Sequence, residues 1–188
     1  MSAVSPAALL EDINLPFIAA TMTIAAVGAL LSGRALAARY GGTRLTAAAL
    51  VLYVGLVVAL TCSPRADSDT GFAGFSDAVR HALRTDVLRS RVLTPLSGAE
   101  ELVNVLLYVP LGFLLVWLTR RPLTALVALV AFSVVVEVWQ GFVGRSLDVG
   151  DVLHNVWGAV LGMATGWVMH RFRSTQMSRN GAATETRA

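Results

Sequence analysis

Eight polar or charged residues lie near one end of three apolar segments, and they are the best candidates for chemistry in this sequence. They are Asn104, Tyr108, Glu137, Gln140, Arg145, Asp148, Asp151 and Asn155. Pairs among them are three or four residues apart, as in Glu137 and Gln140, so their side chains share a helix face. We therefore predict that three helices direct polar edges into one pocket, which is a candidate ligand-binding site.

Glu137 is the ionisable residue that lies well within an apolar segment, and it sets the chemical options. Its carboxylate can act as a general base or a proton carrier, or can join Asp148 and Asp151 in holding a hard cation through oxygen ligands. It can also simply pair with Arg145 or Asn155 and lock the helices together. These residue types favour structural locking over ligand binding, and ligand binding over catalysis, so no catalytic residue is assigned.

Metal and cofactor sites have little support in the sequence. His154 lies three residues after Asp151, which would suit zinc, but a lone histidine in a helix is more often a hydrogen-bonded packing residue. The single cysteine, Cys62, excludes an intramolecular disulfide and a cysteine-based zinc site. The chain has no glycine-rich nucleotide loop, no CxxC and no HExxH. We expect no cofactor and no bound metal, and we favour a non-enzyme over an enzyme.

The composition indicates which elements must position these residues. Of the 188 residues, 55% are hydrophobic and 14% are charged, against roughly 25% charged in soluble domains, and the mean hydropathy is +0.66. Because such a chain lacks the charge for a soluble surface, we predict an all-α, polytopic integral membrane helix bundle. The 15 basic residues are all arginines, and their scattered placement argues against nucleic-acid binding.

Five segments are long and apolar enough to cross a bilayer, which needs roughly 20 helical residues. They are residues 15–32, 45–62, 102–118, 123–143 and 149–170. The acidic Glu11 and Asp12 before the first segment are unlike the basic start of a signal peptide, so we interpret that segment as a retained helix. We predict five transmembrane helices, or four if the first segment does not span.

Clustered arginines follow the first, third and fifth segments, and the positive-inside rule makes these regions cytoplasmic. The predicted order is a short extracellular N-terminus (1–14), two helices with a cytoplasmic arginine loop (15–62), an extracellular loop (63–101), a three-helix core (102–170) and a disordered cytoplasmic tail (171–188). The candidate pocket then faces outward. Within the extracellular loop, residues 76–93 can form either an interfacial amphipathic helix or a solvated one.

A ridge of small residues runs along the last segment. Gly158, Gly162 and Gly166 are four residues apart, and such spacing lets another helix approach closely. We predict that the ridge packs within the bundle rather than between subunits. The sequence gives no oligomeric state.

Three stretches of the sequence resemble one family. The runs NVLLYVPLGFLL, SVVVEVWQ and GRSLDVGDVLHNVWGAVLG, within about residues 101–170, are similar to the VanZ-like family of bacterial membrane proteins, and they contain all eight candidate pocket residues. The resemblance implies a bacterial cytoplasmic-membrane protein. It also implies a link to teicoplanin resistance, which is associated with the family's named member. It transfers no catalytic residue.

Three functions are compatible with these features. The favoured one is an envelope protein that binds a lipidated glycopeptide or a lipid-linked cell-wall precursor at the outer leaflet, among membrane lipids, and contributes to glycopeptide resistance. The alternative is a membrane enzyme that modifies a lipid or wall precursor with Glu137, Asp148 and Asp151. A small transporter is disfavoured because the inner halves of the fourth and fifth segments carry no charge.

Overall fold

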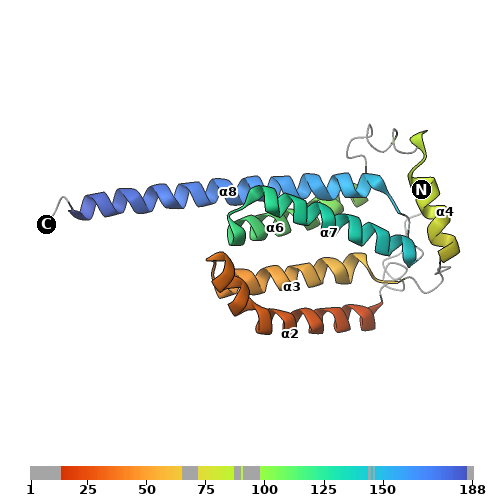
Figure 1. Ribbon diagram of the computed structural model, residues 1–188, viewed down its shortest axis with the longest axis horizontal. Coiled ribbons are helices and arrows are strands. Elements are labelled where there is room, and N and C mark those ends of the chain that lie inside the picture. Colours follow the sequence, from red (N-terminus) through yellow and green to blue (C-terminus); the bar gives the residue numbers. More distant parts are fainter. Residues whose placement is uncertain are drawn as a thin grey trace.

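The computed structural model describes residues 14–64, 72–86, 90, 98–143, 145 and 147–185. Within this part of the chain the main elements are six helices, and no strand occurs. They are α2 (Leu15–Tyr40), α3 (Arg44–Thr61), α4 (Phe72–Ala82), α6 (Ala99–Thr119), α7 (Pro122–Phe142) and α8 (Val149–Glu185). The five longer helices extend in the same general direction, and α4 lies across one end of the bundle beside α7 (Figure 1).

The prediction of an all-helical membrane bundle is confirmed. Among the described residues, α2, α3, α6 and α7 are long and apolar enough to cross a membrane. Large apolar side chains on their outer surfaces are exposed, Leu31 and Leu123 among them, as expected for contact with lipid. Helix α8, whose first turns carry Asp151, His154 and Asn155, is not one of these four. The presence of five transmembrane helices therefore remains a prediction.

The first turn between helices is much shorter than predicted. Helix α2 continues eight residues beyond the predicted end and stops at Gly41, whose φ of 71° is left-handed. Helix α3 begins directly afterwards, capped by the Thr43 hydroxyl, which accepts from the amide of Thr46 at 3.1 Å. Most of the predicted arginine loop is therefore helical: Arg34 and Arg39 lie on α2, because its alanine-rich last turns favour continued helix.

The C-terminal tail is also more regular than predicted. Residues 171–185, where a disordered tail was expected, continue α8 as far as Glu185. This segment contains no proline that would stop a helix. In the 63–101 loop, α4 begins four residues before the predicted helix at 76–93 and ends at Ala82. Residues 85, 86 and 90 are also helical, and residues 87–89 and 91–93 lie outside the described part of the chain. The predicted N-terminus, apart from Asn14, lies outside the described residues.

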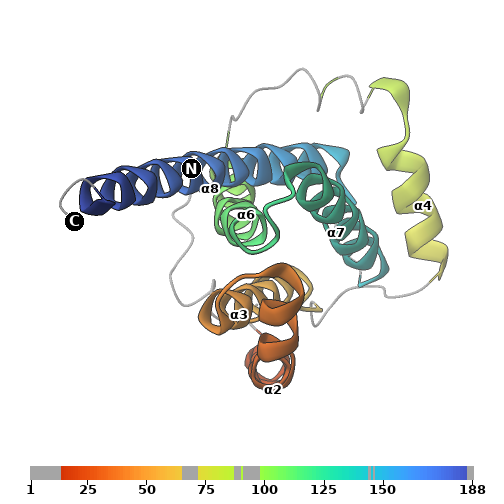
Figure 2. The same ribbon diagram turned by 60° about the vertical axis from the view of Figure 1, so that its left-hand side comes forward.

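Among the helices described, α6 and α8 have the most extensive contact, and they lie side by side (Figure 1 and Figure 2). A Cβ added to Gly158 or Gly162 of α8 would meet the carbonyl oxygen of Val105 or Val109 in α6. The reverse also holds, because a Cβ on Gly112 of α6 would meet the backbone of α8. Small residues on both helices thus allow backbone-to-backbone contact, and the glycine ridge lies against α6.

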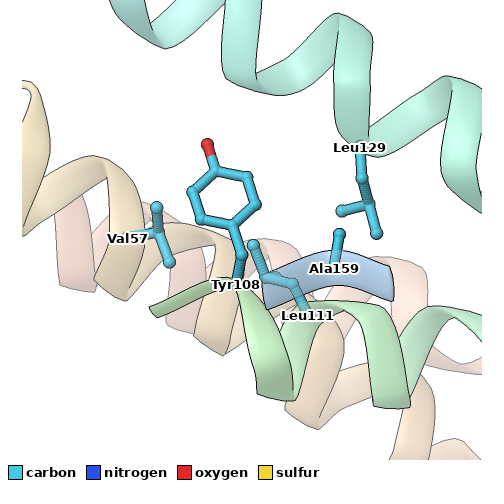
Figure 3. Close-up of a cluster of buried hydrophobic side chains, with 5 residues drawn as sticks. All are labelled: Val57, Tyr108, Leu111, Leu129 and Ala159. Atoms are coloured by element: carbon cyan, nitrogen blue, oxygen red, sulfur yellow. The ribbon is translucent and has the colours of Figure 1, made fainter. Parts of the chain in front are cut away.

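The buried core joins four helices at their middle. Val57 of α3, Tyr108 and Leu111 of α6, Leu129 of α7 and Ala159 of α8 pack together (Figure 3). The Tyr108 ring lies among the aliphatic groups while its hydroxyl points to the edge of the cluster. This core fixes how α6, α7 and α8 are rotated about their axes, and hence which polar side chains meet.

Candidate functional site

A cleft of about 470 Å³ lies at the end of the bundle where α3 and α7 end and where α6 and α8 begin. Its lining mixes apolar and polar side chains. The lining residues are Leu60, Thr61, Ala99, Glu100, Val103, Asn104, Leu107, Gln140, Arg145 and Asp151. A cleft of this volume is large enough for a small molecule and offers it both polar and apolar contacts.

The eight predicted pocket residues divide into two sets in the structure. Four of them line the cleft, and we call these the cleft wall: Asn104, Gln140, Arg145 and Asp151. The other four, Tyr108, Glu137, Asp148 and Asn155, are not among the lining residues. With Ser133 they form the buried polar set, in which only Asp148 is partly exposed.

Glu137 holds the start of α8 against α7. Its side chain is only 4% exposed, and its Oε2 accepts the backbone amide of Asp148 at 3.2 Å. Asp148 in turn accepts the amide of Gly150 through Oδ1 at 2.8 Å, as an N-cap residue does. Both carboxylates are therefore engaged by backbone donors, an arrangement that orders the helix start.

Asn155 and Ser133 form the deeper part of the buried polar set. Asn155 Nδ2 donates to Ser133 Oγ at 3.0 Å and so joins α8 to α7. The Tyr108 hydroxyl lies beside Ser133. Within the described part of the chain, neither that hydroxyl nor Asn155 Oδ1 makes a hydrogen bond of good geometry. Ser133 was outside the predicted site, although its position four residues before Glu137 places the two on one helix face.

The last turn of α7 also fixes the end of α3. Gln140 Nε2 donates to the carbonyl of Thr61 at 2.9 Å, and Trp139 Nε1 donates to the carbonyl of Cys62 at 3.0 Å. The Gln140 carbonyl accepts the amide of Arg145 at 2.9 Å. These bonds satisfy carbonyls that a helix end leaves open. Sequence reasoning missed Thr61 and Cys62, because they contribute backbone oxygens that any residue type would supply.

Two further side-chain contacts lie at this end of the bundle. His154 Nδ1 lies 3.9 Å from Asp151 Oδ1, one turn along α8. Phe75 of α4 stacks on Phe142 of α7 with ring centroids 4.1 Å apart, which ties α4 to the same end of the bundle. No group of three or more histidine, cysteine or acidic side chains that could hold a metal occurs in the residues described.

Comparison with known proteins connects this arrangement to one family. A model of the VanZ/LLP1 family matches residues 50–170. No curated protein and no solved structure matches the chain. The family match covers both the cleft wall and the buried polar set, and it extends beyond the predicted 101–170 to include most of α3. Since it covers well over half of the sequence, the chain belongs to the VanZ/LLP1 family.

Proposed function

We propose that this protein binds the polar head of an amphiphile in the cleft at the outer face of a bacterial cytoplasmic membrane. The ligand is a lipidated glycopeptide or a lipid-linked cell-wall precursor, and binding contributes to teicoplanin resistance. The observation that carries the proposal is the cleft itself, which combines amide, charged and apolar side chains between four helices.

The proposed topology has five crossings. Gly158, Gly162 and Gly166 contact successive turns of α6, so a bilayer crossed by α6 is crossed by α8 as well. The arginines at the α2 and α6–α7 ends belong on the cytoplasmic side by the positive-inside rule. The opposite end, which holds the cleft, then faces outward, with the N-terminus outside and the C-terminus in the cytoplasm.

The cleft wall supplies the recognition chemistry for such a ligand. The Asn104 and Gln140 amides can bond sugar hydroxyls and peptide groups, and Arg145 can attract a phosphate or carboxylate. Apolar contact from Leu60 and Leu107 suits the adjoining hydrocarbon. A wholly polar ligand would leave this apolar surface unused, so the lining favours an amphiphile.

The enzyme and transporter alternatives gain no comparable support. Glu137, the proposed acid or base of the enzyme alternative, is engaged with the Asp148 amide and is not a lining residue of the cleft. Binding without a chemical step explains the same geometry and requires no acid or base in the cleft.

Drug susceptibility of a sensitive Gram-positive host tests the proposal. The host would express the wild type, an empty vector, Arg145→Gln or the matched control Arg34→Gln, which lies on α2 outside the cleft, at equal membrane levels. We expect the wild type and Arg34→Gln to protect against teicoplanin but not against vancomycin, and Arg145→Gln to lose most protection. Absence of protection by the wild type would overturn the link to resistance.

A further inference from the structure

A second cavity, of about 410 Å³, lies at the opposite end of the bundle from the cleft. It is formed where α2 ends and where α6 turns into α7. The lining residues are Arg39, Tyr40, Leu115, Thr119, Arg121, Thr124, Ala125 and Ala128. None of them belongs to the cleft wall or to the buried polar set, so this cavity needs an explanation of its own.

Two guanidinium groups give the cavity its charge. Arg39 comes from the last turn of α2, where its guanidinium lies 5.8 Å from the centroid of the Tyr40 ring, and Arg121 precedes α7. Residues 14–64 and 102–136 contain no aspartate or glutamate. The acidic residues of α6 and α7, Glu100, Glu101 and Glu137, lie toward the cleft end. The helices that line this cavity therefore supply no carboxylate there, and an anionic molecule would complement the two guanidinium groups.

The turn that carries Arg121 is well ordered by local bonds. Thr119 Oγ1 donates to the carbonyl of Leu115 at 2.7 Å and accepts the amide of Arg121 at 3.3 Å. Arg120 adopts a left-handed φ of 56° and ends α6, and Pro122 starts α7 at once. Arg121 is thus placed at the cavity by the backbone, while the adjacent Arg120 is not a lining residue.

The remaining lining suits a molecule with an apolar part. Leu115, Ala125 and Ala128 supply hydrocarbon surface, and Tyr40 and Thr124 add hydroxyl groups. The neighbouring surface of α7 is strongly exposed, at 73% for Leu123 and 63% for Val127. An acyl chain can lie along this surface while its headgroup occupies the cavity.

We propose that this cavity binds the phosphate headgroup of an anionic membrane lipid, with Arg39 and Arg121 as the cationic partners. Arginine recognises phosphate well because its planar donors match the phosphate oxygens, and basic pockets between helices at the cytoplasmic side are a known form of lipid site. The positive-inside rule assigns the lipid to the cytoplasmic leaflet. The proposal does not depend on what the cleft binds.

Native mass spectrometry of the purified full chain in neutral detergent tests this site. The probes are phosphatidylglycerol, phosphatidylcholine with the same acyl chains, and free glycerol 3-phosphate. We expect the wild type to retain phosphatidylglycerol at least tenfold more strongly than phosphatidylcholine and to bind glycerol 3-phosphate far more weakly. The variants Arg39→Gln and Arg121→Gln should each lower phosphatidylglycerol affinity about fivefold, and the double variant about 25-fold.

Two matched controls separate the site from net charge. Arg34→Gln on α2 and Arg120→Gln beside Arg121 remove the same charge but lie outside the cavity lining, and both should retain wild-type selectivity. Equal losses in the control and cavity variants would overturn the site in favour of general charge attraction. Equal retention of the two lipids by the wild type would also overturn it, and tight binding of glycerol 3-phosphate would replace the lipid with a soluble phosphate. Unfolding temperatures in detergent verify that each variant is folded. If the double variant is not folded, the two single variants are compared with the wild type instead.

Discussion

The cleft wall and the buried polar set come from the same three sequence runs, yet the structure uses them differently. In the buried polar set, Glu137 accepts a hydrogen bond from the Asp148 amide, and Asn155 donates one to the Ser133 hydroxyl. The cleft wall, by contrast, contributes to the lining of the cleft, and its Gln140 also bonds to the carbonyl of Thr61. Polar residues of one cluster can therefore divide within a single turn of helix, some holding helices together and others lining a cleft.

We expect the largest loss of stability from a change in the contact between α6 and α8, the helices that contribute residues to both sets. Gly162→Ala places a Cβ against the carbonyl of Val109, where backbone atoms leave no room. We expect it to lower the free energy of unfolding by about 3 kcal/mol. The matched control Gly28→Ala meets only Val51 at 3.5 Å and should be neutral or slightly stabilising. Unfolding in detergent measures both, and equal stability of the two variants would contradict the described α6–α8 contact.

Within the buried polar set, Glu137→Leu should be the most damaging change. It removes the acceptor of the Asp148 amide, and a buried donor left without a partner costs about 1–3 kcal/mol. Glu137→Gln keeps an acceptor oxygen and should cost less. The measurement is the unfolding temperature in detergent, compared with Asp151→Asn in the cleft wall. If Asp151→Asn destabilised the protein as much as Glu137→Leu, the division between the two sets would fail.

The hydrogen bond between Asn155 and Ser133 should give a smaller effect. A double-mutant cycle with Asn155→Leu and Ser133→Ala is expected to yield a coupling energy of about 0.6 kcal/mol, as is usual for hydrogen bonds between membrane helices. Equilibrium unfolding of the four proteins measures it. A coupling energy of zero would show that the 3.0 Å contact does not stabilise the bundle.

The cleft wall should show the smallest effect on stability. Arg145→Gln is expected to change the free energy of unfolding by less than about 0.5 kcal/mol, because Arg145 is only half-buried and ion pairs open to solvent contribute little. The same unfolding assay applies, and Arg34→Gln is the control for lost charge. If Arg145→Gln alone lost much stability, Arg145 would have a structural role, and its assignment to ligand binding would be weakened.

The sequence predicted the helices well because hydrophobic length is a strong signal. All five predicted segments reappear as helices. The starts of α2, α3, α6, α7 and α8 and the ends of α3, α6 and α7 lie within three residues of the predictions. The end of α2 was missed, since nothing in an alanine-rich run marks where a helix leaves the membrane. The glycine ridge indicated close packing, and the structure identifies α6 as its partner.

The residues of the candidate site were predicted, but their division into a cleft wall and a buried polar set was not. Helical spacing places Glu137 and Gln140 on one face, but it does not determine which of them reaches the cleft. That outcome depends on how α7 and α8 are rotated, which the backbone contact of Gly158 with Val105 helps to fix. The carbonyls of Thr61 and Cys62 left no signal, since their role is independent of side-chain type.

Direct binding to the purified protein in lipid nanodiscs tests the central claim, that the cleft wall receives an amphiphile. Fluorescently labelled teicoplanin and a lipid-linked disaccharide–peptide precursor would each be titrated against the wild type, Arg145→Gln and Arg34→Gln. We predict that the wild type and Arg34→Gln bind at least one of them equally well. Arg145→Gln should bind that ligand about tenfold more weakly, as expected for loss of a charged hydrogen bond. Failure of the wild type to bind either ligand, or equal affinity of Arg145→Gln, would contradict the claim.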